Sequence, residues 1–152
     1  MSQEFGASGG TGGGAYNAAS PPAQDHGPWK IGVINGRSGG RIDLIELVWV
    51  NSQHATRESA RFGGNTGGPF QFTIADDDYL TEIRGSVGAF DDNVRVFSLQ
   101  FLTRDGGASP VFGEPSGVPF FFECPNGFQL TGIFGRSGSG LDSLGVFMEN
   151  IP

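Results

Sequence analysis

The sequence predicts an all-β domain with internal threefold repetition, and three observations lead to this prediction. The chain has 152 residues, of which 27 are Gly and 9 are Pro, so short strands separated by turns are favoured over long helices. No segment has a convincing helical period, whereas several runs alternate polar and apolar residues. One glycine-rich motif occurs twice, with a weaker copy between the two. Repeats of this kind decide the architecture of a chain.

The repeated motif is a glycine-rich loop that ends in aspartate and leads into an apolar run. Residues 36–43 read Gly-Arg-Ser-Gly-Gly-Arg-Ile-Asp, and residues 135–142 read Gly-Arg-Ser-Gly-Ser-Gly-Leu-Asp. The weaker copy, residues 80–92, aligns without gaps on the last one and places Asp92 at the position of Asp142. The even spacing predicts that each third of the chain contributes a strand, a glycine loop and another strand.

Strands are expected wherever an apolar or alternating run lies between turn residues. The run at 56–62 is polar, as in an edge strand, and the Phe-Phe-Phe run at 120–122 is expected to be buried. Trp29 and Trp49 flank strands and are expected in the core. In chain order the expected strands cover residues 29–34, 45–50, 56–62, 70–74, 94–101, 120–122 and 130–134, with a further strand beginning at Tyr79.

The length of the chain indicates one domain, expected over residues 9–152. Residues 1–8 are expected to form a flexible lead-in. They do not have the pattern of a signal peptide, and no apolar run reaches membrane-spanning length. A cytoplasmic or non-classically secreted protein is therefore expected, without membrane insertion.

Charge and the reactive side chains exclude several classes of function. The formal net charge of −7 argues against nucleic acid, whose phosphates need a basic surface. Cys124 is the single cysteine, so neither an intrachain disulfide nor a cysteine-rich metal site is expected. His26 and His54 lie in polar loops without an obvious nucleophile or metal partner. No metal, cofactor or catalytic residue is predicted.

The motifs resemble those of the jacalin-related lectins. The resemblance is closest at residues 132–138, which read Gly-Ile-Phe-Gly-Arg-Ser-Gly, and residues 79–85 and 98–103 match as well. It runs from about Gly9 to Phe147, nearly the whole chain. The resemblance implies a β-prism I fold, in which three four-stranded Greek-key sheets surround a pseudo-threefold axis. This expectation agrees with the repeats, which are visible without it.

The resemblance also implies a carbohydrate site between the aspartate loop of one repeat and the glycine loop of another. By position, this first site consists of Gly13, Ser139, Gly140 and Asp142. Asp142, expected at an exposed loop, would accept charge-assisted hydrogen bonds from two neighbouring sugar hydroxyls. Backbone N–H groups of Ser139 and Gly140 would donate to sugar oxygens. Gly13 would let the backbone approach the sugar closely.

A second and a third site follow from the other copies of the motif. The second site would consist of Gly40, Arg41 and Asp43, facing Gly68. Its glycine loop, residues 63–68, reads as one residue longer than the loop at 9–13, so the register of Gly68 stays open. The third copy implies a site at Asp92 only weakly. Its partner loop near residues 111–117 lacks the double glycines, and Pro115 removes an N–H donor.

The resemblance implies a non-catalytic lectin that binds glycans and glycoproteins of the mannose or glucose type and forms a homodimer. Galactose-preferring members are cleaved to free an amino-terminal glycine at the main site, whereas here the chain is continuous through residues 1–14. Two alternatives stay open: a β-prism module for protein association or targeting without sugar binding, and a galactose-preferring lectin. A glycosidase is disfavoured because hydrolysis needs two carboxyl groups facing one bond, and the motif supplies one per site.

Overall fold

The computed structural model describes residues 3–19, 29–51, 56–90 and 93–152. These residues form strands and turns without a helix, which confirms the all-β prediction, and none of their segments is a helix able to span a membrane. Most strands start and end at glycine-rich or polar turns. The strands are β1 (Gln3–Gly9), β2 (Gly14–Ala18), β3 (Lys30–Ser38), β4 (Ile42–Asn51), β5 (Thr56–Gly63), β6 (Gly68–Thr73), β7 (Leu80–Phe90), β8 (Asn93–Thr103), β9 (Phe112–Gly113), β10 (Val118–Glu123), β11 (Phe128–Ser137) and β12 (Leu141–Asn150).

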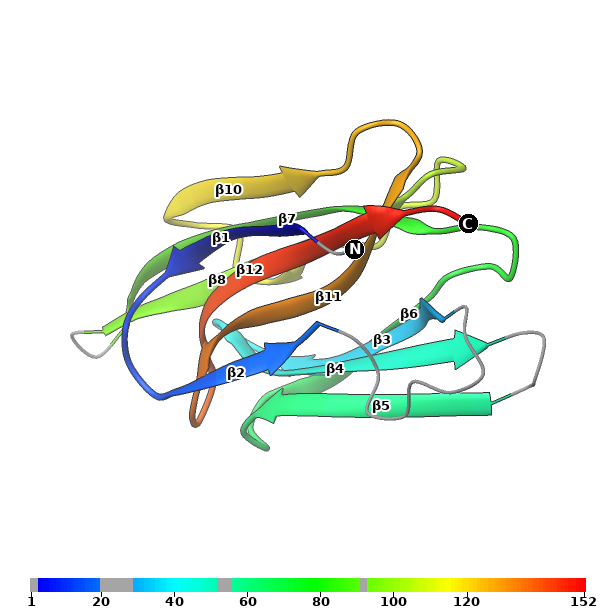
Figure 1. The fold of residues 1–152 in the computed structure, drawn as a ribbon. Coiled ribbons are helices and arrows are strands. Elements are labelled where there is room, and N and C mark those ends of the chain that lie inside the picture. The colour runs from blue at the N-terminus through cyan, green and yellow to red at the C-terminus, as the bar shows by residue number, and fades with distance from the viewer. Residues whose placement is uncertain (1–2, 20–28, 52–55, 91–92) are drawn as a thin grey trace.

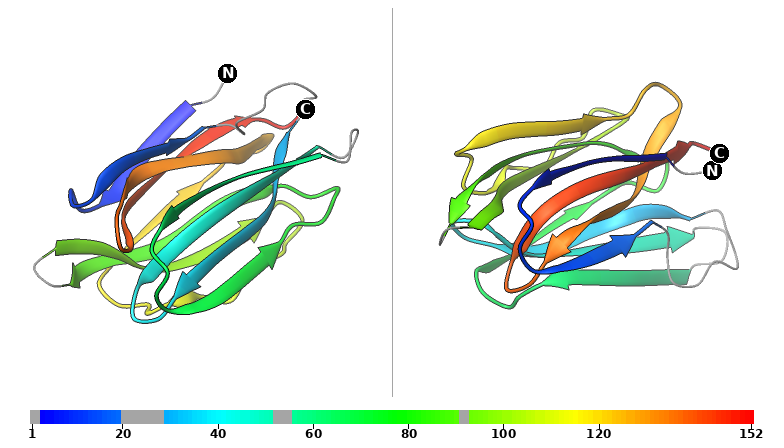
Figure 2. Two further views of the ribbon diagram at one scale, coloured as in Figure 1. Left: turned by 90° about the horizontal axis from the view of Figure 1, so that it is seen from below. Right: turned by 60° about the vertical axis from the view of Figure 1, so that its left-hand side comes forward.

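The strands form three antiparallel sheets of four strands each, as predicted (Figures 1 and 2). Sheet A has the order β1-β12-β11-β2, sheet B the order β5-β4-β3-β6, and sheet C the order β10-β7-β8-β9. In each sheet the two central strands form a long hairpin, β11–β12, β3–β4 or β7–β8. In sheets B and C the edge strands follow the hairpin along the chain, whereas in sheet A the edge strands β1 and β2 come from the opposite end of the chain. The polar strand β5 lies at an edge, as expected from its sequence.

The three central hairpins share the same irregularities, which establishes how the repeats correspond. Each hairpin has two register shifts, and the second shift follows the first at the same interval in every copy. This spacing places Leu80 at the position of Leu130, as the sequence alignment predicted. The shifts lie between Leu130/Gly132 and Arg136/Ser137 in sheet A, Ile31/Val33 and Arg37/Ser38 in sheet B, and Leu80/Glu82 and Ser86/Val87 in sheet C.

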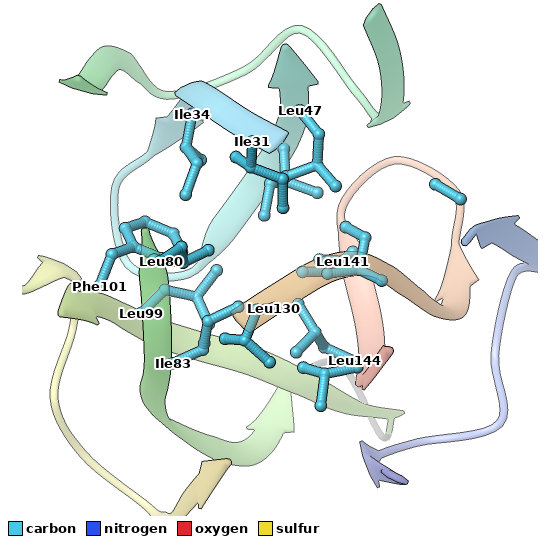
Figure 3. Close-up of a cluster of buried hydrophobic side chains, with 14 of the residues drawn as sticks. Ile31, Ile34, Leu47, Leu80, Ile83, Leu99, Phe101, Leu130, Leu141 and Leu144 are labelled. Carbon is cyan, nitrogen blue, oxygen red and sulfur yellow. The ribbon is translucent and has the colours of Figure 1, made fainter. Parts of the chain in front are cut away.

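The inner faces of the sheets meet in one apolar core (Figure 3). Sheet A contributes residues such as Leu130 and Leu144, sheet B Ile34, and sheet C Leu99, all of which are at most 1% exposed. Trp49 is 1% exposed, which confirms its predicted place in the core. Its indole N–H donates to the carbonyl of Thr131 at 2.8 Å and so joins sheet B to sheet A.

Some segments at the sheet edges differ from the sequence-based expectation. Residues 1–8 were expected to be a lead-in, but Gln3–Gly9 forms β1, which pairs with β12. The glycine-rich segment has low intrinsic strand propensity, and an existing neighbour strand supplies its hydrogen-bond partners. The expectation of a wholly buried run at 120–122 is wrong because β10 is an edge strand. Phe120 and Phe122 pack on the core, whereas Phe121 is 67% exposed.

Candidate functional site

The glycine loops and the turns of the central hairpins gather at one end of the molecule, away from both termini (Figure 1). All three glycine loops have the same length, over residues 9–13, 63–67 and 113–117, and the first and last residue of each is a glycine with φ between 66° and 125°. Few residues other than glycine adopt this backbone conformation. The N–H of the second loop residue donates to a carbonyl of the adjacent strand: Gly10 to Asp142 (2.8 Å), Gly64 to Asp43 (2.7 Å) and Glu114 to Phe97 (2.9 Å).

The equal loop lengths resolve the register of the second site. The sequence analysis read the second glycine loop as one residue longer than the first, which is wrong. Gly68 pairs with Ser38 just as Gly14 pairs with Ser137, so both glycines already belong to strands. Gly67, and not Gly68, therefore stands where Gly13 stands in the first site.

The third repeat has no carboxylate at the equivalent position. The carbonyl that accepts from the third glycine loop belongs to Phe97, so Phe97 takes the place of Asp142 and Asp43. The ungapped alignment fails because residues 88–95 of the β7–β8 hairpin stand where β11–β12 has only residues 138–140. Asp92 itself lies outside the described residues. An apolar ring in place of the acceptor is unsuited to binding hydroxyl groups.

In the first site the Asp142 carboxylate lies against the glycine loop. A Cβ atom on Gly13 would stand 2.6 Å from Asp142 Oδ2, so only glycine permits this approach. Asp142 Oδ1 forms an ion pair with Arg95 Nη1, and the Asp142 residue is 0% exposed. The expectation of an exposed carboxylate is therefore wrong. Arg95 is contributed by β8 in sheet C, not by either loop of the site.

The second site repeats this geometry with different donors. A Cβ atom on Gly67 would stand 2.5 Å from Asp43 Oδ2. Asp43 Oδ1 accepts from Thr66 Oγ1 at 2.9 Å and from Arg41 Nε at 3.1 Å. Asp43 is 5% exposed, and neighbouring Gly40 is exposed with nothing within 4 Å of its Cβ position. The predicted residues Gly40, Arg41 and Asp43 are thus brought together.

The arginine of each Gly-Arg-Ser-Gly motif fixes the glycine loop of its site. Arg136 donates to the carbonyls of Gly12 (3.0 Å) and Gly13 (2.7 Å). Arg37 does the same for Thr66 (3.2 Å) and Gly67 (2.6 Å). The sequence analysis recognised the motif but gave these arginines no role. Their recurrence at one offset in both copies was the available signal.

The two sites are in contact with each other. Arg41 of the second site donates from Nη2 to Ser139 Oγ of the first, at 3.5 Å. Its guanidinium also covers Gly140, where a Cβ atom would stand 3.0 Å from Arg41 Cζ. Of the two predicted donors of the first site, Ser139 is exposed and Gly140 is buried.

Each glycine loop contacts the central hairpin of another sheet, and the three contacts run in a circle from sheet A to C, from C to B and from B to A. The Gly10 loop of sheet A rests on the Val94 carbonyl of sheet C, and the Gly64 loop of sheet B rests on the Ser139 carbonyl of sheet A. The Gly113 loop of sheet C contacts the side chain of Ile42 in sheet B. Each loop therefore depends on the hairpin of a neighbouring repeat.

Each of the two sites offers a carboxylate as an acceptor of hydrogen bonds. Among the described residues, no group of three or more His, Cys, Asp or Glu side chains is placed to hold a metal ion. Away from the two sites, burial and the nearby charge of Glu123 raise the pKa of the Cys124 thiol to about 12, so the thiol stays protonated at neutral pH. A carboxylate beside an open backbone turn suits ligands that carry several hydroxyl groups.

Comparison with known proteins identifies the family. Residues 5–147 match the family model described as the jacalin-like lectin domain. The chain is 32% identical over 123 residues to horcolin from Hordeum vulgare, covering 80% of this chain and 83% of horcolin. It is 29% identical over 121 residues to myrosinase-binding protein 2 from Arabidopsis thaliana, covering 79% of this chain but 17% of that protein.

A solved structure shows the same fold. AcmJRL from Ananas comosus superposes with a TM-score of 0.83 at 24% identity, covering 99% of each chain. Fold and family match together define a β-prism of the carbohydrate-binding lectin class. The chain belongs to the family of jacalin-like lectin domains.

Proposed function

We propose that this protein is a non-catalytic lectin that binds mannose- or glucose-type glycans at the Asp142 and Asp43 sites. The observation that carries the proposal is the recurrence of one arrangement in two repeats, a carboxylate Oδ2 against a positive-φ glycine held by a motif arginine. Sugar hydroxyls would donate to the carboxylate, and the open glycine backbone would admit the ring.

The choice of mannose-type sugars rests on the form of the first site. The chain runs from β1 through the glycine loop at residues 9–13 into β2. In this continuous form it places no free amino group beside Asp142. The hairpin positions 139 and 140 carry Ser and Gly, which provide no aromatic platform for the apolar face of galactose. AcmJRL, which shares the fold, is described as mannose binding.

A protein-association role is the second candidate. It is favoured by the match to myrosinase-binding protein 2, whose name describes binding to a protein. The two roles differ in their response to free monosaccharide. A lectin binds it through the carboxylates, whereas an association module does not.

The proposal is tested by calorimetric titration of the protein with methyl α-mannoside and, in parallel, with methyl α-galactoside. We expect mannoside binding in the millimolar to sub-millimolar range, about 4 to 5 kcal/mol per site. Tighter binding of the galactoside would refute the mannose assignment, and the absence of binding to either sugar would favour the association role.

Replacing Gly67 by Ala is expected to abolish binding at the second site, whereas Gly68→Ala is expected to preserve it. In the Gly67→Ala variant the added Cβ would collide with the Asp43 carboxylate, and the alanine would need an unfavourable positive φ. At Gly68 the nearest atom to a new Cβ is 3.9 Å away, an ordinary contact. Titration of the two variants with mannoside measures the difference. Equal binding by both variants would contradict the assigned register.

A further inference from the structure

Arg95 binds the Asp142 carboxylate at the place where a sugar would have to bind. Its Nη1 forms the ion pair with Asp142 Oδ1, and its side chain is 14% exposed. Val94, the residue before it, places its carbonyl against Gly10 of the first glycine loop. Both residues belong to the part of the β7–β8 hairpin that is longer than the other two central hairpins.

The second site pairs its carboxylate with an arginine of its own hairpin turn, not with one from another sheet. Asp43 receives its hydrogen bonds from Thr66 and Arg41, which belong to the two loops of that site. In the first site the positions of Thr66 and Arg41 are taken by Gly12 and Gly140, neither of which has a side chain to donate. Asp142 is therefore neutralised by a residue from a different sheet.

The closed first site leaves two polar atoms unsatisfied. Asp142 Oδ2 and Arg95 Nε are both buried and have no hydrogen-bond partner among the described residues. Burying such atoms without partners is unfavourable. Arg95 occupies Oδ1, and Oδ2 is buried beside Gly13 of the glycine loop. Displacing the guanidinium of Arg95 would free Oδ1 as an acceptor.

We infer that Arg95 competes with sugar for Asp142 and so determines which of the two sites is occupied first. This inference rests on the proposed function. In the unmodified chain the Asp43 site takes monosaccharide more readily, because its arginine, Arg41, belongs to the site and can stay paired. Sugar at the Asp142 site must first displace the guanidinium of Arg95, which comes from another sheet. A ligand hydroxyl that donates to Asp142 Oδ2 then satisfies the atom that the closed site leaves without a partner.

The experiment isolates the first site by disabling the second. Asp43→Asn serves as the background, and Arg95→Met is added to it to remove the charge while keeping an unbranched side chain of moderate length. Arg84→Met in the same background is the matched control, because Arg84 lies on β7 and pairs with Glu82 away from both sites. Calorimetric titration with methyl α-mannoside is expected to show roughly 10-fold tighter binding with Arg95→Met, about 1.4 kcal/mol, and no change with Arg84→Met.

Unchanged affinity in the Arg95→Met variant would overturn the inference. Weaker affinity would overturn it as well, since Arg95 would then position the carboxylate for the ligand.

A second measurement does not depend on sugar. The Arg95 Nε–H resonance, observed by nitrogen-15 NMR, is expected to exchange slowly in the ligand-free protein and rapidly in Asp142→Asn. Fast exchange in the unmodified protein would refute the closed site. If no variant binds any sugar, the proposed function fails, while this measurement still decides whether Arg95 covers Asp142.

Discussion

Replacing both Asp43 and Asp142 by Asn is expected to abolish monosaccharide binding, weakening it by roughly 100-fold or more. Each carboxylate is the charged acceptor of its site, and hydrogen bonds to a charged acceptor are about twice as strong as neutral ones. Asn keeps the shape of the side chain but offers one neutral oxygen and an NH₂ group that would oppose Arg95 or Arg41. Calorimetry with methyl α-mannoside measures the loss. Retained binding would exclude both sites.

The stability of the double variant must be measured as a control, so that lost binding is not confused with unfolding. Asp142 is fully buried and paired with Arg95, so its replacement is expected to cost about 1–3 kcal/mol of unfolding free energy. Adding Arg95→Met removes the unpaired charge and is expected to restore part of that stability. Circular dichroism and thermal melting of both variants show whether lost binding reflects the sites or an unfolded chain.

Replacing Trp49 by Ala is expected to lower the unfolding free energy by about 3–5 kcal/mol. The side chain is 1% exposed and fills the space between sheets. Its N–H bonds the carbonyl of Thr131, the residue skipped by a register shift between β11 and β12. The loss is a large part of the 5–15 kcal/mol typical of a domain and corresponds to a fall in melting temperature of roughly 10 °C or more.

Trp49→Phe separates the two contributions. It keeps most of the buried ring but leaves the Thr131 carbonyl without its donor, for an expected cost of about 1–3 kcal/mol. Denaturant unfolding measures both variants. An equal loss for Phe and Ala would show that the hydrogen bond, and not the volume, dominates at this position.

The architecture was predictable because the repeats and alternating runs are local features of the sequence. Strands with β-branched and aromatic residues, such as β4 and β8, were expected close to their observed bounds. Strands β1 and β2 were not expected, because glycine-rich segments carry little local preference. Their strand conformation comes from pairing with β12 and β11.

The candidate sites were predictable only in part. Asp142 and Asp43 were singled out because they lie at fixed offsets in a repeated motif, whereas Gly13 was implied by the resemblance to jacalin-related lectins. Gly68 was predicted where the structure has Gly67, because the point at which the loop ends and β6 begins depends on strand pairing and not on residue type. Arg95 was missed altogether, because it reaches Asp142 from another sheet at a separation of 47 residues.

The cyclic bracing of the glycine loops means that the thirds of this molecule do not vary independently. A change in the length of one hairpin is expected to shift the glycine loop of the adjoining sheet that contacts it. Sheet C has Phe97 where the other repeats have a carboxylate, so its hairpin serves no acceptor of its own. We expect an insertion there to leave its own repeat intact and to alter the first site, which Val94 and Arg95 contact. A repeat without a carboxylate at this position would in that way adjust the site of another repeat.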